Sequence, residues 1–183
     1  MRIISGTQKG RRITAPKNLP VRPTTDMAKE ALFNILNNHY YFDSISVMDL
    51  FAGTGNISFE FGSRGCTDIT AVDAHYACVK FIDQTAKQFD FDIMALKNNA
   101  YTFLEKTAQK AHVIFADPPY DFTKDQFLQI ANTVFDRELL LEGGMLIIEH
   151  SQHTDLSEHS NYSHSKKYGG NRFSFFEHED EEE

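Results

Sequence analysis

Short apolar runs alternate with longer segments whose apolar residues recur at helical spacing over most of the chain. The runs predict strands at residues 46–50, 69–72, 93–96, 112–116 and 144–149. The segments between them predict helices at residues 57–62, 76–89, 100–109 and 124–135. Strands this apolar are typical of a parallel sheet, because its connecting helices bury both faces. We therefore expect an α/β fold with helices on both faces of a mostly parallel sheet.

The residues before this alternation predict a small separate element. Residues 2–5 and 11–14 have the pattern of two short strands, joined by a turn that ends at Gly10. A series of prolines then keeps the backbone extended, namely Pro16, Pro20 and Pro23. A helix is expected to begin at Thr24-Thr25-Asp26, with Thr or Asp as its N-cap.

The C-terminal part predicts a loop followed by strand. Residues 151–165 are rich in Ser and His and are expected to form a loop, whereas residues 166–176 predict one strand or a strand pair. We divide the chain into a basic hairpin arm (residues 1–24), a main domain (25–176) and an acidic tail (177–183). The tail is expected to be disordered by self-repulsion of its charges.

Charge is distributed unevenly along the chain. The net charge of −8 argues against nucleic-acid binding at first sight. Residues 1–30, however, carry seven basic and two acidic residues, and residues 173–183 carry six acidic residues and no basic one. A basic arm on an acidic body can still contact phosphate groups. The alternative is a solvated basic hairpin without a partner.

Cysteine, histidine and apolar content restrict the class of protein. Cys66 and Cys78 do not make a disulfide framework, so we expect reduced thiols in a cytoplasmic protein. The first ten residues lack the apolar stretch of a signal peptide, and no segment approaches the ~20 apolar residues of a membrane span. The eight histidines show no metal-ligand spacing, so we expect no metal. We expect a monomer without a membrane partner.

A glycine-containing turn follows the first main strand. The segment from Asp49 to Gly55 reads DLFAGTG and leads from a strand into a helix. Its two glycines, Gly53 and Gly55, permit a sharp turn and close approach of a ligand to the backbone. Asn56 follows, and the third glycine of the dinucleotide fingerprint is missing. The segment alone is compatible with a ligand site or with a tight turn that binds nothing.

Polar residues also follow the next two strands. Asp73, about 20 positions after the glycine turn, could accept hydrogen bonds from both ribose hydroxyls of an adenosine. A side-chain carbonyl in Asn98-Asn99-Ala100 could accept from an adenine amine. Each signal is weak alone, because a solvated aspartate and a plain Asn-Asn turn are at least as common.

The segment Asp117-Pro118-Pro119-Tyr120 is the most specific motif. It directly follows an apolar strand. Two prolines hold the backbone extended and donate no hydrogen bond, so carbonyl groups there can face a substrate unpaired. Asp117 and the Pro118 carbonyl provide two acceptors, which suit the two N–H bonds of an aromatic amine. Tyr120 provides a flat face for stacking a base, worth roughly 1–3 kcal/mol in nucleic-acid complexes.

These motifs resemble a known family. Asp117 to Tyr120 is similar to the [DNS]-P-P-[YFW] signature of methyltransferases that act on adenine N6, guanine N2 or glutamine amide groups. The segments RIISG from Arg2, KGR from Lys9, RPTTD from Arg22 and EALFN from Glu30 resemble the N-terminal half of the RsmD family, bacterial 16S ribosomal RNA guanine-N2 methyltransferases. Ser63-Arg64-Gly65 and Ile148-Glu149-His150 fit the same family.

The resemblance implies a fold and a set of roles. The implied fold is a Rossmann-like class I S-adenosylmethionine-dependent methyltransferase, with a mostly parallel seven-stranded sheet and an N-terminal β-hairpin extension. The implied cofactor residues are Asp49, Phe51, Gly53 and Gly55 at the methionine part, Asp73 at the ribose, and Asn99 and Ala100 at the adenine. The implied guanine-binding residues are Asp117, Pro118 and Tyr120. The residues implied to touch RNA or close over the cofactor are Arg2, Arg11, Arg22 and Thr24.

The chain departs from the family at three places. Asn99 stands where Asp is more common, Asp73 and His75 stand where two acidic residues are more common, and Met27-Ala28-Lys29 replaces a more basic stretch. The expected partner is 16S ribosomal RNA within the small subunit. The alternatives are a DNA adenine-N6 methyltransferase and a non-catalytic ribosome-binding module. A nicotinamide dehydrogenase is opposed by the missing third glycine and by the double proline.

Overall fold

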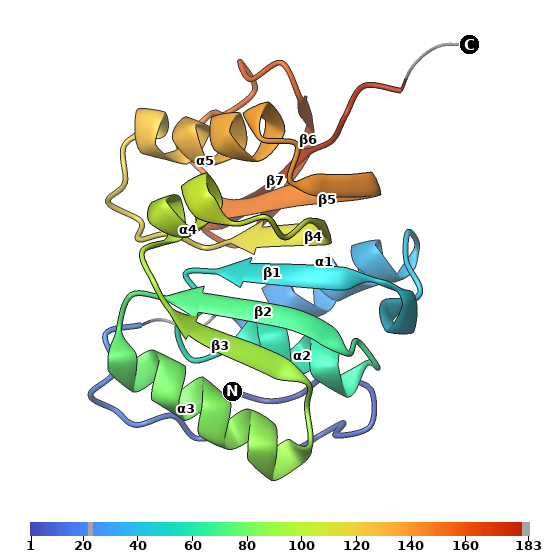
Figure 1. Ribbon diagram of the computed structural model, residues 1–183, viewed down its shortest axis with the longest axis vertical. Helices are drawn as coiled ribbons and strands as arrows, with labels where there is room; N and C mark the ends of the chain where they lie inside the picture. The colour runs from blue at the N-terminus through green and yellow to red at the C-terminus, as the bar shows by residue number, and fades with distance from the viewer. Residues whose placement is uncertain (22–23, 181–183) are drawn as a thin grey trace.

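A computed structural model of the protein describes residues 1–21 and 24–180 (Figure 1). Arg22, one of the expected RNA contacts, lies outside the described residues. The described strands form one sheet in the order β3-β2-β1-β4-β5-β7-β6. Its strands are β1 (Ser46–Leu50), β2 (Asp68–Asp73), β3 (Ile93–Lys97), β4 (Ala111–Ala116), β5 (Leu140–Ser151), β6 (Tyr162–Tyr168) and β7 (Asn171–Phe176). β1 to β5 are parallel and the last two strands are antiparallel, which confirms the mostly parallel seven-stranded sheet.

Helices cover both faces of this sheet, as expected. They are α1 (Asp26–Asn37), α2 (Asn56–Ser63), α3 (Tyr76–Phe89), α4 (Ala100–Lys106) and α5 (Lys124–Asp136), with a short 3-10 turn η1 (Phe42–Ser44). α4 and α5 pack with one face of β1, β4 and β5, and α1 and α2 pack with the other. α3 contacts β2 and β3 (Figure 1).

Side-chain caps explain where two of these helices begin. The Thr25 side chain accepts a hydrogen bond from the Ala28 N–H, which fixes the start of α1 where the sequence predicts it. Thr123 and Gln126 form a reciprocal capping box at the start of α5. The predicted end of the helix 100–109 is wrong, because α4 ends at Lys106 and Thr107 is already extended.

The C-terminal strands also differ from the prediction. β5 begins at Leu140 rather than at residue 144, and the expected loop 151–165 includes the start of β6. β6 and β7 are a hairpin that turns at Gly169-Gly170. β6 is the outer strand of the sheet, and most of its side chains are exposed. A polar edge strand lacks the apolar pattern that marks a buried one, so its composition predicted a loop.

The N-terminal segment is a short hairpin docked on α2. One antiparallel bridge joins Arg2 and Arg12, and backbone hydrogen bonds run from the Ile3 N–H to the Arg11 oxygen and from the Ile13 N–H to the Met1 oxygen, both at 2.9 Å. The next N–H groups, of Ile4 and Ser5, donate instead to the buried Glu60 carboxylate of α2 at 3.0 to 3.1 Å, so the ladder stops. Ile3 packs in a cluster with Phe59 of α2 and other apolar side chains.

One glycine permits this docking. Gly6 has φ +90, and a Cβ built on it would lie 1.9 Å from the Ser63 carbonyl oxygen at the end of α2. The neighbouring Thr7 N–H donates to the same oxygen at 2.7 Å. The segment can therefore approach α2 this closely only with glycine at residue 6.

Candidate active site

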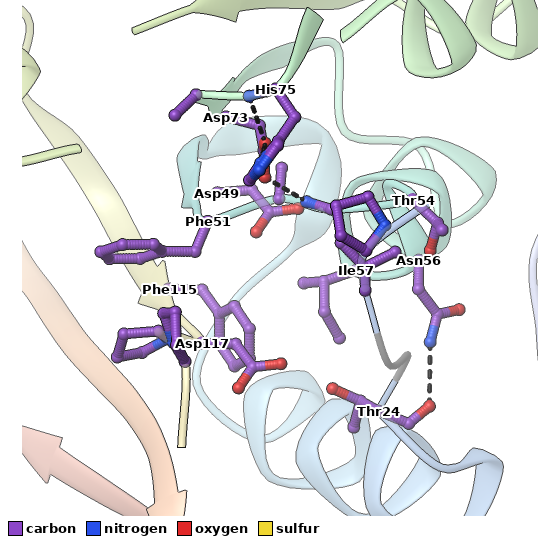
Figure 2. A pocket seen from close by; sticks show the side chains of 17 residues that line it. Thr24, Asp49, Phe51, Thr54, Asn56, Ile57, Asp73, His75, Phe115 and Asp117 are labelled. Atoms are coloured by element: carbon purple, nitrogen blue, oxygen red, sulfur yellow. Dashed lines mark hydrogen bonds and ion pairs between the residues drawn. The ribbon is translucent and has the colours of Figure 1, made fainter. Parts of the chain in front are cut away.

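The carboxyl ends of β1, β2 and β4 meet at one pocket. It encloses about 280 Å³, close to the lower end of the range for ligand pockets, about 300–1,000 Å³. The described residues that line it are Pro20, Val21, Thr24, Asp49, Phe51, Ala52, Gly53, Thr54, Asn56, Ile57, Asp73, Ala74, His75, Phe115, Asp117, Pro118 and Pro119. Figure 2 shows Asp49 and Asp117 pointing into this space from two sides, with Phe51 at its edge. Polar groups that follow three strands therefore converge, as expected for a parallel sheet.

The glycine turn that leads from β1 into α2 forms one wall. Phe51, Gly53 and Gly55 all have positive φ, at 55, 57 and 82. A Cβ at Gly55 would lie 2.8 Å from the Phe59 Cζ and 2.9 Å from the Ile82 Cγ1. The turn therefore needs glycine at residue 55 for conformation and for space. The Phe51 ring contacts Phe122 edge-on, with centroids 5.7 Å apart.

Asp49 is a buried carboxylate at the floor of the pocket. It accepts hydrogen bonds from the Ser58 N–H at 3.2 Å and from the Ser58 hydroxyl at 2.6 Å. Burial raises the pKa of Asp49 to about 7, because the Ser58 hydrogen bonds offset only part of the lost hydration and the Asp73 charge adds to the shift. A cationic ligand group beside Asp49 would favour the ionised carboxylate and lower its pKa again.

Asp73 holds the glycine turn from the neighbouring strand. One carboxylate oxygen accepts from the Gly53 N–H at 2.9 Å, and the other accepts from the His75 N–H at 2.9 Å (Figure 2). The ring nitrogen Nδ1 of His75 also lies 3.2 Å from Oδ1, so Oδ2 is the oxygen that keeps a lone pair for a ligand hydroxyl. Asp73 is thus able to bind a ribose and also fixes the loop that surrounds it.

Asp117 follows β4 and has two carboxyl groups nearby. In the register of β4 and β5, Ala116 pairs with Ile148, which makes Asp117 and Glu149 neighbours across the two strands. Burial, the charge of Glu149 and then that of Asp49 raise the pKa of Asp117 well above its usual range. Burial also raises the pKa of Glu149, against the hydrogen bonds from Thr24 and Asn171.

Thr24 connects the segment before α1 to this carboxyl pair. Its hydroxyl donates to Glu149 Oε2 at 2.7 Å, and its main-chain oxygen accepts from Asn56 Nδ2 at 3.0 Å (Figure 2). Pro20 and Val21 of the same segment also line the pocket. Of the two roles expected for Thr24, the structure agrees with a place at the pocket rather than on an exposed RNA surface.

Three expected site residues, Tyr120, Asn99 and Ala100, do not line the pocket. Tyr120 is 89% exposed and does not line the pocket, although Pro119 beside it does. The Asn99 side chain caps α4, where its oxygen accepts from the N–H groups of Tyr101 at 2.9 Å and Thr102 at 3.2 Å. The expectation that this oxygen is free for an adenine amine is wrong, because the helix N-terminus uses it. Ala100 is buried at the start of α4 and does not line the pocket either.

Three basic residues of the N-terminal part have partners within the protein. Arg2 pairs with Asp26 at 3.4 Å, and the Arg11 guanidinium lies 5.1 Å from the centroid of the Phe89 ring. Lys29 is only 1% exposed, and its ammonium donates to Asn56 Oδ1 at 2.8 Å. Counting Lys29 with the exposed positive charge of this region was therefore wrong, since a buried ammonium cannot reach a phosphate group.

Sequence reasoning missed Asn56 and Glu149 as functional candidates. In the sequence Asn56 stands out only as the residue that follows Gly55, and Glu149 only as part of a family resemblance. One feature could have identified Glu149. A carboxylate at the end of the apolar strand that pairs with β4 lies beside Asp117. Among residues 1–21 and 24–180, no group of three or more His, Cys, Asp or Glu side chains could hold a metal ion. No helix in that part of the chain is long and apolar enough to span a membrane.

Comparison with known proteins gives relatives over most of the chain. The family model described as "Conserved hypothetical protein 95" matches residues 1–177. The chain is 35% identical over 164 residues to "Putative rRNA methyltransferase YlbH" of Bacillus subtilis, and the match covers 86% of each chain. It is 28% identical over 150 residues to "Ribosomal RNA small subunit methyltransferase D" of Escherichia coli, covering 81% of this chain and 74% of that one.

Solved structures share the fold. "Putative methyltransferase yhhF from Escherichia coli" matches with a TM-score of 0.80 at 24% identity, over 96% of both chains. A Thermus thermophilus 16S rRNA N2 methyltransferase, RsmC, solved with AdoMet and guanosine, matches with a TM-score of 0.68 at 17% identity. That match covers 87% of this chain and 45% of RsmC. At these identities the likeness shows a shared fold.

Proposed function

The chain belongs to the RsmD family of methyltransferases, and on this premise we propose that it transfers a methyl group from S-adenosylmethionine to the exocyclic N2 of a guanine in 16S ribosomal RNA. The observation that carries the proposal is that Asp117 and Pro118 line the same pocket as the glycine turn and Asp73. A binding site for an adenosine and a binding site for an aromatic amine are therefore continuous.

The acceptor groups of the pocket suit S-adenosylmethionine. Asp49 offers a carboxylate to the α-ammonium group of the methionine part. Asp73 would offer Oδ2 to one ribose hydroxyl, and Oδ1 to the other once the exposed His75 ring turns away from it. Phe51 offers an aromatic edge of the pocket to the adenine. Asn99 and Ala100 remain candidates for an adenine contact through α4, with the Asn99 oxygen already used.

The Asp117–Pro118 segment suits an aromatic amine. The lone pair of guanine N2 is delocalised into the ring, so the free amine is a poor nucleophile. The Asp117 carboxyl and the Pro118 carbonyl would accept its two N–H bonds and direct the lone pair at the methyl carbon, which supplies proximity and alignment. When bound, S-adenosylmethionine supplies a methyl carbon whose bond to sulfur breaks with the electron pair left on sulfur. Acceptors at the nitrogen stabilise the positive charge that develops there.

Substrate RNA would reach the pocket past two exposed features. Tyr120 directly follows the pocket residue Pro119 and is free to stack on a base that has left its helix. The exposed Arg2 and Arg11, with Arg22, would contact phosphate groups. The first two have weak internal partners at the surface, which an RNA phosphate could replace. The protein would act on ribosomal particles in the cytoplasm.

Methyl transfer to defined acceptors tests the proposal. Small ribosomal subunits from cells without this gene, naked 16S RNA and duplex DNA would each be incubated with the protein and methyl-labelled S-adenosylmethionine. We expect label in the ribosomal RNA, recovered as N2-methylguanine after digestion. Label in DNA adenine would support the DNA methyltransferase instead, and no transfer to any acceptor would support a binding module.

A substitution at Asp117 separates the two halves of the site. Asp117→Ala should lower kcat by a large factor and leave cofactor affinity nearly unchanged, because the side chain lies at the amine position. Calorimetry gives the affinity and single-turnover transfer gives the rate. A variant that loses cofactor affinity but keeps its rate per bound complex would contradict the assignment.

A further inference from the structure

Two carboxyl groups lie side by side at the back of the pocket. Asp117 follows β4 and Glu149 ends the apolar part of β5, and the register of the two strands makes them neighbours. Asp117 is partly exposed on the pocket wall, whereas Glu149 is 2% exposed. Two neighbouring carboxyl groups in a buried place disfavour two negative charges, so the pair favours one proton and one negative charge. A protonated carboxyl can then donate its hydroxyl to the ionised one.

The surroundings of the two groups decide which one keeps the proton. Glu149 Oε2 accepts from the Thr24 hydroxyl at 2.7 Å, and Oε1 accepts from Asn171 Nδ2 of β7 at 3.0 Å. Both bonds stabilise an ionised Glu149. The charged groups that raise the pKa of Asp117 are both carboxyls, Glu149 and Asp49 of β1. The resting arrangement is thus a neutral Asp117 that donates its hydroxyl to an ionised Glu149, with a carbonyl oxygen left for the pocket.

On the basis of the proposed function, we propose that Glu149 is the positioning residue that receives, through Asp117, the proton released by the methylated amine. As the N–C bond forms, the nitrogen becomes cationic and one of its N–H bonds must break. That proton forms a new O–H bond on the carbonyl oxygen of Asp117, while the hydroxyl proton of Asp117 passes to Glu149. The pair changes from one negative charge to none, and the amine becomes neutral.

The resting protonation of Asp117 is testable in the free protein. Carbon NMR of the protein labelled at aspartate Cγ follows each carboxyl, and the signal missing from Asp117→Asn identifies residue 117. We expect Asp117 in the wild type to keep its proton to a higher pH than an ordinary aspartate does, because burial and the neighbouring carboxyl groups raise its pKa. In Glu149→Gln the neighbouring negative charge is gone and an amide can donate, so the pKa of Asp117 should fall by about one unit or more. Equal titration of Asp117 in both proteins would overturn the proposal.

The role of Glu149 in the reaction is testable with both carboxyls in place. Asn171 is exposed at the start of β7, and Asn171→Ala removes one donor from Glu149. The ionised form is then less stable, so the pKa of Glu149 rises. The reactive form has an ionised Glu149, so it should be lost at a higher pH as the solution is acidified. In the plot of kcat against pH, the acid limb, where kcat decreases at low pH, should therefore move up by about half a pH unit. A purely structural role for Glu149 would lower kcat at every pH and leave the limb in place.

Matched measurements separate the possible failures. Asn132→Ala removes another exposed asparagine, on α5 beside His159, and should leave the acid limb where it is in the wild type. An acid limb that is the same in Asn171→Ala and wild type would refute the proton relay. Absence of methyl transfer by the wild type would refute the proposed function instead, while the NMR titration would still report on the carboxyl pair.

Discussion

Cofactor binding should depend on pH through Asp49. Its pKa is raised to about 7, chiefly by burial, so a large part of the free protein carries a neutral Asp49 at physiological pH. A ligand ammonium group favours the ionised carboxylate. Binding should therefore release a proton, and affinity should fall as the pH falls through the pKa.

The size of the effect follows from that pKa. The apparent Kd scales with one plus the ratio of proton concentration to the acid constant of Asp49. For a pKa of about 7, this factor is about 33 at about pH 5.5 and about 1.3 at about pH 7.5, which predicts a change of about 25-fold, or about 1.9 kcal/mol. An aspartate with its ordinary pKa would be fully ionised across this range and would give a flat profile.

Calorimetry with S-adenosylhomocysteine is the appropriate assay, because this ligand keeps the ammonium group but carries no sulfonium charge. Titrations at about pH 6.5 in buffers of different ionisation enthalpy should report release of about 0.8 proton per ligand bound. Asp49→Asn is the matched variant, and it should bind weakly with a flat pH profile and no proton release. A wild-type Kd that is constant across the range would refute the placement of the ammonium group at Asp49.

Three further predictions concern residues around the site. Asp73→Ala should raise the cofactor Kd by roughly 2–4 kcal/mol in binding free energy, measured by calorimetry, and a Kd within twofold of wild type would mean that the ribose is held elsewhere. Lys29→Met should lower the free energy of unfolding in urea by about 3 kcal/mol, because it leaves the Asn56 side-chain oxygen and the Arg2 carbonyl without their ammonium donor, and unchanged stability would contradict this. Changing Arg2, Arg11 and Arg22 together to Ala should flatten the salt dependence of RNA binding by about 0.7–0.9 per lost phosphate contact, whereas an unchanged slope would place the RNA surface elsewhere.

The sequence predicts those parts of the fold that are buried on both sides. β1, β2 and β4 are mostly buried along their length and were placed within one residue of their true bounds. The first part of β6, residues 162–165, was assigned to a loop, because an edge strand needs no apolar face. The N-terminal hairpin was predicted too long, because its backbone N–H groups bind a carboxylate from α2. A distant partner of this kind leaves no local pattern in the sequence.

The candidate site was predictable where position in the chain fixes position in space. Asp49, Asp73 and Asp117 lie at the ends of parallel strands, so topology alone brings them together. Asn99 also follows a strand, but its side chain turns back to cap a helix. Glu149 was missed as a site residue because its role depends on the register between two strands. The register of β4 against β5 and the rotamer of Asn99 both depend on how the folded chain packs. A short sequence motif does not contain that information.

The close approach of Gly6 to the Ser63 carbonyl matters for anyone who redesigns this protein. Gly6 is exposed, so a protocol that fixes buried positions and varies the surface would treat it as free. Any other side chain would have to displace the main chain at the end of α2, since its Cβ would fall 1.9 Å from a backbone oxygen. The substitution would move the N-terminal segment away from Glu60 and break the hydrogen bonds to its carboxylate. A resulting loss of solubility or yield would be difficult to attribute to this exposed residue. Gly6 should be held constant together with the core.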